Sequence, residues 1–446
     1  MPSREARSGG PRVIPGRVGG FNRCEAGADT PRVELRPSSA HVPVAVFALV
    51  LAGAVLALGT RDPFWNGDFL NEAWPAYMAL AAGDVGGFLG RSPAYSGFLA
   101  LVGAPVVEVV HHTIGGVDAI GRGVRPVYVL TAVPGILALA ALGAALAARV
   151  RLALPRSRMW LLVAALGAGS PIAYQALLYG HPEDVLAASL SVFGVLAARG
   201  GRPTTAGIVL ALAVVCKQWA VLAVLPAMLA SDSRALRIGV IAGAGAVVAL
   251  APLVALTPAS HGPLVSSGAL FHPHQVWWPL GVPADAAYVA GGHGERMAPA
   301  WLMSLTHPLI VLLALPLSAL WWLCAGRARR NRDDAFALLA LLFLERCALD
   351  PWNLVYYQLP LVLSLLAWEV HRRKGVPVVT LAVTAATWLS FVTYSERGGY
   401  GPFAAYLAWA LPLAAWLAWR LYRPRARHAS VAASVRRAGR LSLAPR

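Results

Sequence analysis

The chain has 446 residues, of which 57% are hydrophobic and only 13% are charged, and its mean hydropathy is +0.59. About a quarter of the residues of a soluble globular protein are charged, so this composition excludes a soluble enzyme, a disordered chain and a coiled coil. It predicts an all-α polytopic membrane protein. The formal net charge of +17 would suggest nucleic-acid binding in a soluble protein, but short cytoplasmic loops of a membrane protein also carry excess arginine.

The chain begins with a polar segment and then becomes apolar. Residues 1–43 are rich in Gly, Pro and Arg and predict a disordered cytoplasmic tail, whereas 44–422 form the predicted membrane domain and 423–446 a second basic cytoplasmic tail. About 20 apolar residues cross a bilayer, and we expect about ten spans. They lie near 44–59, 126–148, 159–179, 183–198, 238–257, 301–324, 334–349, 354–370, 376–395 and 402–422.

Two further apolar segments are not expected to be simple spans. If 94–112 crossed the membrane, the arginine cluster that follows 126–148 would lie outside, so we interpret 60–125 as a long external loop with two interfacial helices, near 68–82 and 95–111. Segment 205–231 has Lys217 near its centre, where a span would lose roughly 2.5–3.5 kcal/mol on insertion. A short re-entrant hairpin of two helices that meet at Lys217 avoids this cost.

The distribution of charge supports this topology. With these assignments 30 of the 38 basic residues lie on one side, whereas 13 of the 21 acidic residues lie on the other. The rule that cytoplasmic loops are positive then places both termini in the cytoplasm and the protein in the plasma membrane. The net charge therefore needs no nucleic-acid partner.

Carboxylates of the first external loop are candidates for a general base. Ionisable groups at membrane depth mark functional sites by default, and Asp68 follows the first span in the sequence GDFLNEAW. Asp68 could activate a substrate hydroxyl or merely cap the helix that follows. Asp62 and Glu72 are alternatives, although Asp62 precedes a proline and Glu72 could be a solvated side chain.

The sequence LLYGHPED forms a predicted external turn between two spans. It contains His181, Glu183 and Asp184. The imidazole could hydrogen-bond an anionic head group and Glu183 could contact substrate, but a polar loop or a helix cap is an alternative interpretation for the acidic residues.

Lys217 is one of only two lysines, against 36 arginines. It lies in the sequence CKQW, beside Gln218 and Trp219, which we expect to contact substrate. We interpret Lys217 as a phosphate-binding cation that acts with Arg346. The alternative is an ion pair with an acidic neighbour, as is common for charges inside membranes.

The sequence LERCALDPWN ends a later span. Glu345 and Arg346 are adjacent and so do not face each other on a helix, Asp350 begins the external turn, and Trp352 could stack on a sugar. An ordinary polar end of a span is an equally good interpretation.

Histidines gather in the external loop 258–300, in and around the sequence FHPHQVWWPLG. The spacing of His272, His274, His261 and His293 is too loose to argue for a metal. We favour an aromatic lid over a substrate cavity, with His272 in contact with substrate, and expect neither a metal nor another cofactor.

In this order, the GDF aspartate, GHPED, CKQWA, FHP…WWPLG and LDPWN…YYQLP resemble actinobacterial proteins of glycosyltransferase family 87 over roughly residues 45–422. The family is similar to mannosyltransferases of the GT-C fold that use polyprenyl-phosphate mannose. The resemblance implies inverting transfer on the extracytoplasmic side, with Asp68 as base and a glycan or glycolipid acceptor. The usual residues after that aspartate are replaced here by FLNEAW, which keeps Asp62 as an alternative.

The chemistry of a sugar phosphate agrees with the resemblance, because phosphate is a good leaving group and needs no general acid. The site must deprotonate an acceptor hydroxyl and hold the phosphate, for which we expect Lys217, Arg346 and His181. The polyprenyl tail would lie in the bilayer. A secondary transporter of an anionic solute, for which internal repeats are expected, and a lipid-linked-sugar flippase or scaffold are the alternatives.

Overall fold

The structure is a computed structural model, and all of its described residues belong to one compact unit, Ala40–Arg446. They are residues 41–61, 67–92, 95–114, 123–150, 156–231, 234–256, 270–283, 294–325, 332–372, 375–393 and 400–423. Apart from a few residues, the two predicted tails lie outside these ranges.

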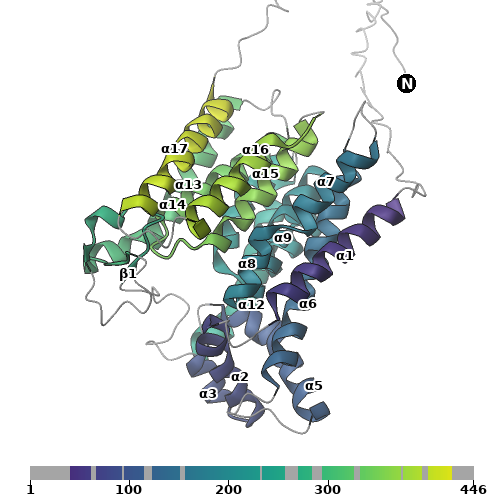
Figure 1. Ribbon diagram of the computed structural model, residues 1–446, viewed down its shortest axis with the longest axis vertical. Helices are drawn as coiled ribbons and strands as arrows, with labels where there is room; N and C mark the ends of the chain where they lie inside the picture. The colour runs from purple at the N-terminus through teal and green to yellow at the C-terminus, as the bar shows by residue number, and fades with distance from the viewer. Residues whose placement is uncertain are drawn as a thin grey trace, which may run out of the picture. The chain divides into compact units, whose positions relative to one another are not determined.

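Helices dominate the described residues, and one is found at each of the ten predicted spans (Figure 1). They are α1 (His41–Gly59), α6 (Val124–Ala147), α7 and α8 (Arg156–Ala168, Pro171–Tyr179), α9 (Pro182–Arg199), α12 (Ala235–Leu256), α13 (Ala300–Ala325), α14 (Asp334–Leu349), α15 (Leu359–Arg372) after a 3₁₀ turn (Val355–Gln358), α16 (Val378–Trp388) with a π-helical turn (Leu389–Thr393), and α17 (Tyr400–Tyr422).

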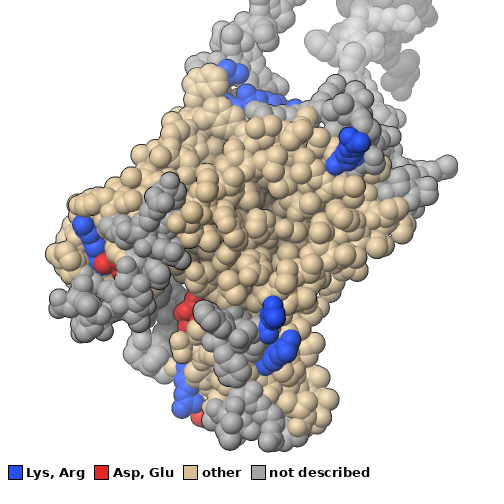
Figure 2. Space-filling view, in the orientation of Figure 1, with Lys and Arg blue, Asp and Glu red and all other residues tan. Residues whose placement is uncertain are grey.

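Seven helices in the described part of the chain are long and apolar enough to cross a membrane. Figure 2 shows the surface that such helices produce: on the face in view, charged side chains gather toward two opposite ends, and the central surface between them is uncharged. The chain is therefore an all-α membrane protein, whereas the count of about ten spans stays a prediction. The candidate spans are Val42–Gly59, Ser96–Ile114, Val124–Ala147, Arg158–Tyr179, Ala235–Leu256, Ala300–Cys324 and Tyr400–Tyr422.

Four predicted spans, α9, α14, α15 and α16, are not among these seven, and the first three lie inside the bundle. Almost every residue of these three helices is buried against its neighbours. A helix that is covered on all sides needs no apolar surface for lipid, so it can carry polar groups. Glu183 and Asp184 begin α9, and Arg346 lies in the last turn of α14.

The segment after α1 forms a small helical group with its own apolar core, which includes the start of α6. Figure 1 shows α2, α3 and α5 of this group together at one end of the bundle. The two predicted interfacial helices are present and α3 was not predicted. Ser96–Ile114 is long enough to span, so its interfacial position stays a prediction. The group comprises η2 (Phe69–Ala73), α2 (Trp74–Ala81), α3 (Val85–Arg91), α4 (Ser96–Phe98), η3 (Leu99–Gly103) and α5 (Ala104–Ile114).

As predicted for 205–231, two helical arms meet at Lys217, whose backbone is extended (φ −155°, ψ 120°). The first arm is α10 (Pro203–Cys216); the second is η4 (Gln218–Ala223) followed by α11 (Val224–Ala230). Gly207 of the first arm lies against Ile241, and Met228 of the second lies against Gly239. Because both contacts are near the start of α12, the second arm returns toward the beginning of the first and Lys217 is at the tip.

A short three-stranded antiparallel sheet, in the order β1-β3-β2, lies in the loop between α12 and α13. The strands are β1 (Leu270–Phe271), β2 (Val282–Pro283) and β3 (Arg296–Met297). Met297 of the central strand pairs with Leu270 of β1 and with Val282 of β2. Phe271 and Trp278 are buried there together with Leu302. The loop thus forms a folded aromatic layer at the end of the bundle.

Candidate functional site

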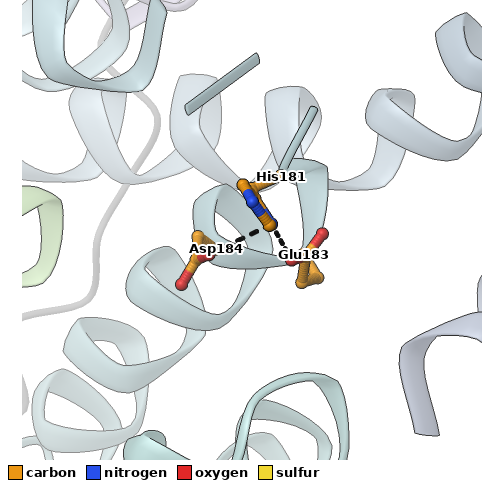
Figure 3. A group of neighbouring side chains, drawn as sticks. All are labelled: His181, Glu183 and Asp184. Atoms are coloured by element: carbon orange, nitrogen blue, oxygen red, sulfur yellow. Dashed lines mark hydrogen bonds and ion pairs between the residues drawn. The ribbon is translucent and has the colours of Figure 1, made fainter. Parts of the chain in front are cut away.

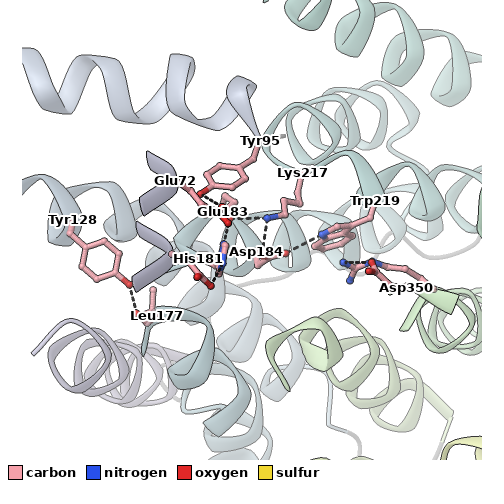
Figure 4. A network of polar contacts seen from close by, with 12 residues as sticks. Glu72, Tyr95, Tyr128, Leu177, His181, Glu183, Asp184, Lys217, Trp219 and Asp350 are labelled. Atoms are coloured by element: carbon pink, nitrogen blue, oxygen red, sulfur yellow. Dashed lines mark hydrogen bonds and ion pairs between the residues drawn. The ribbon is translucent and has the colours of Figure 1, made fainter. Parts of the chain in front are cut away.

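Polar residues from segments far apart in the sequence converge at the start of α9, as Figure 4 shows. Pro182 occupies the first turn of this helix, where a proline costs no hydrogen bond, and Glu183 and Asp184 follow it. Carboxylates in a first turn are stabilised by the partial positive charge of the helix N-terminus. The two acidic side chains are 0% and 1% exposed, so the stabilisation acts away from water.

His181, just before α9, bridges two carboxylates. Its Nε2 lies 3.1 Å from Asp68 Oδ2 and its Nδ1 lies 2.7 Å from Glu183 Oε1. Burial alone would lower the pKa of the imidazole, but Glu183 and the hydrogen bond to Asp68 raise the pKa of His181 to about 10. The ring is therefore protonated at neutral pH, and both nitrogens donate. Tyr356 stacks on the ring, with centroids 4.7 Å apart.

Gly180 allows the first loop to reach this histidine. Its φ is +96°, a left-handed conformation that favours glycine. A Cβ at this position would lie only 2.6 Å from the backbone nitrogen of Phe69. Glycine therefore lets the backbone next to Asp68 pack directly on the turn that carries His181.

Lys217 extends the network on its other side. Its Nζ lies 2.8 Å from Glu183 Oε1 and 3.2 Å from Asp184 Oδ2, and 4.4 Å from the centre of the Tyr95 ring. Trp219, two residues farther along, donates its indole N–H to Asp184 Oδ1 at 3.0 Å. The ion pair that the sequence allows as an alternative for Lys217 is thus present.

His181, Glu183 and Asp184 also form the kind of group that can hold a metal ion (Figure 3). One possible ligand atom from each lies within 4.8 Å of the others. The Lys217 ammonium, however, already contacts both carboxylates of the group.

Arg346 lies next to this network with its guanidinium between two aromatic rings. Its Cζ is 4.9 Å from the centre of the Trp219 ring and 4.2 Å from that of Tyr357. Nη2 is 3.5 Å from Asp350 Oδ2, one helical turn later, whereas buried Nη1 has no hydrogen-bond partner within the described part of the structure. The group therefore has donor capacity to spare for an anion.

The remaining predicted residues lie around these contacts. Glu72 is exposed and accepts a hydrogen bond from the Tyr95 hydroxyl at 2.9 Å. Trp352 donates its backbone N–H to Asp350, and its ring lies 4.8 Å from that of His272. Gln218 begins η4 and is half-buried. Asp62 lies outside the described residues.

The sequence analysis missed the aromatic residues of the site. Tyr95 lies under Lys217, Tyr356 stacks on His181, and Tyr357 lies under Arg346. It also left Asp184 open as a polar loop residue, although this carboxylate contacts both Lys217 and Trp219. The pair of tyrosines soon after LDPWN was the available signal, because tyrosine faces attract cations.

The sequence profile of glycosyltransferase family 87 matches residues 121–349, just over half of the chain. This range includes His181, Glu183, Lys217 and Arg346 and leaves out Asp68. Comparison with curated protein sequences gives no match. The family match and the apolar helices together identify the chain as a membrane glycosyltransferase that belongs to glycosyltransferase family 87.

Proposed function

We propose that the protein transfers a hexose, with mannose as the first candidate, from a polyprenyl-phosphate donor to a glycan or glycolipid acceptor. The reaction takes place on the extracytoplasmic side of the plasma membrane, and both termini of the chain lie in the cytoplasm. One observation carries the assignment of the site. A partly exposed carboxylate, Asp68, is hydrogen-bonded to a buried imidazolium at the edge of a charged network inside a membrane glycosyltransferase.

Asp68 is the proposed general base because it is the accessible carboxylate that is hydrogen-bonded directly to His181. Its side chain is 39% exposed, whereas those of His181 and Glu183 are 5% and 0% exposed. His181 fixes one carboxylate oxygen and leaves the other to take the proton of the acceptor hydroxyl. The acceptor oxygen then bonds to the anomeric carbon as its bond to the phosphate oxygen breaks, and the polyprenyl phosphate leaves with both electrons of that bond.

In this proposal Arg346 is the main residue that binds the donor phosphate. Lys217 already lies on two carboxylates, and a phosphate would have to displace one of them. Arg346 Nη1 is buried without a partner among the described residues, and the rings of Trp219 and Tyr357 hold the guanidinium plane in place. A planar guanidinium is well suited to two phosphate oxygens.

Replacing Asp68 by asparagine tests the proposal. Loss of a general base costs about 10²–10⁴ in rate, so we expect Asp68→Asn to lose sugar transfer from polyprenyl-phosphate mannose at a normal level of folded protein. Glu108→Gln is a matched control, since this carboxylate is exposed in the same helical group and pairs with His112 one helical turn away. Full activity in Asp68→Asn would refute the assignment.

A further inference from the structure

The three-residue cluster at the start of α9 has the ligands of a divalent-metal site. After loss of the proton that Nδ1 donates to Glu183, His181 could supply this nitrogen, and Glu183 and Asp184 could supply carboxylate oxygens, all within 4.8 Å of one another. Imidazole with carboxylates is a usual ligand set for divalent transition metals. Glu183 Oε2 is buried and has no hydrogen-bond partner among the described residues, so the cluster retains unused capacity to bind a cation.

The side-chain ammonium of Lys217 nevertheless already occupies the place of a cation in this cluster. Lys217 Nζ lies 2.8 Å from Glu183 and 3.2 Å from Asp184, and these three side chains are at most 14% exposed. Without Lys217, the two adjacent buried carboxylates would share the one positive charge of His181, which would be strongly destabilising. Lysine can fill such a place because its ammonium is a compact point charge, whereas a guanidinium is broad and planar.

The backbone around Lys217 orients the ammonium toward the two carboxylates. The first hairpin arm ends at Cys216, the lysine itself is extended, and a new helical turn begins at Gln218. The break directs the side chain toward the start of α9, and the Tyr95 ring covers the ammonium from another side (Figure 4). The lysine is thus held by two carboxylates and one aromatic face.

We propose that Lys217 is the resident cation of a site that otherwise has the ligands for a divalent metal. The ammonium occupies the place of the ion, so the natural protein binds no metal between His181, Glu183 and Asp184. Removal of the ammonium uncovers a metal site there. The inference concerns binding and does not depend on the donor or acceptor of the enzyme.

Cobalt(II) binding to the purified full-length protein tests this proposal, because the visible absorption of bound Co²⁺ reports its ligands. We expect Lys217→Ala to bind about one Co²⁺ per chain and to unfold at a higher temperature with Co²⁺ than with EDTA. Wild type, which keeps the ammonium in place, should show neither effect. In the double variant Lys217→Ala/Asp184→Asn the affinity should fall by about 10- to 100-fold, as for the loss of one ligand.

Two results would overturn the proposal. One is a stoichiometric Co²⁺ site in wild type that disappears in Asp184→Asn, which would show a metal beside Lys217. The other is equal binding by Lys217→Ala and the double variant, which would show that the cluster does not accept the ion. If Lys217→Ala does not accumulate, Lys217→Met keeps most of the side-chain volume: a folded yield that rises with Co²⁺ supports the inference, and a yield that is the same with Co²⁺ and EDTA contradicts it.

Discussion

Gly180→Ala should inactivate the enzyme more than it unfolds it. A left-handed conformation costs an alanine about 1–2 kcal/mol, and at this position the new Cβ would also lie 2.6 Å from the Phe69 nitrogen and 2.8 Å from the Phe69 Cβ. Contacts of this kind are relieved only if the first loop moves outward by a large fraction of an ångström. Asp68 precedes Phe69, so it moves away from His181. A misplacement of about 1 Å can cost roughly 10²-fold in rate.

Gly201 provides the control for backbone strain. Its φ is +72°, but a Cβ there would have no atom within 4 Å, so Gly201→Ala carries the conformational cost without displacing a neighbour. The assay compares the rate of sugar transfer and the thermal unfolding of both variants in the same detergent. We expect a large loss of rate only in Gly180→Ala. Equal rates in the two variants would refute the idea that close approach at Gly180 positions Asp68.

Two further predictions concern other parts of the molecule. Arg346→Lys keeps the charge but loses the planar group between two rings, and we expect the KM for the donor to rise by about 10- to 100-fold, the equivalent of one charged hydrogen bond. The control is Arg423→Lys, which should leave this KM unchanged; the Arg423 guanidinium lies 4.5 Å from the ring of Trp419. An unchanged KM in both variants would argue against a phosphate role for Arg346. Burial lowers the pKa of His274 from its ordinary value of 6.5 to about 4, so the unfolded chain binds more protons between these values and the free energy of unfolding should fall as the pH falls from 6.5 to 4, by up to about 3 kcal/mol. Thermal unfolding against pH should show this slope in wild type and a smaller one in His274→Gln, and equal slopes would contradict it.

Most helices of the fold were predictable because lipid and apolar neighbours impose the same simple pattern. The sequence predicts helices at all ten expected spans and at both arms of the hairpin around Lys217. The helix Val85–Arg91 was missed because it is short and contains three internal glycines, which weaken helical propensity. The small sheet was missed because its strands have two residues each, too few for an alternating pattern.

The individual charges of the site were predictable, but their pairing was not. Lys217 and the first turn of α9 are 34 residues apart, and Asp68 and His181 are 113 residues apart. Only the packing of the hairpin and the first loop against α9 brings them together. Composition identifies a lysine as unusual at membrane depth, but it does not distinguish a carboxylate partner from a phosphate. The two adjacent acidic residues of GHPED are the signal in the sequence that favours the carboxylate partner for Lys217.

The aromatic loop before α13 has a consequence for how substrates reach the site. Its backbone and side chains donate hydrogen bonds of 2.9–3.0 Å to the carbonyl oxygens of Ala348, Leu349 and Pro351, at the end of the helix that carries Arg346. Lifting the loop would break three hydrogen bonds at about 0.5–1.5 kcal/mol each and would also expose the buried Trp278 ring. The loop therefore acts as a fixed wall, and the lipid-borne donor of the proposed function would approach sideways, along the plane of the bilayer.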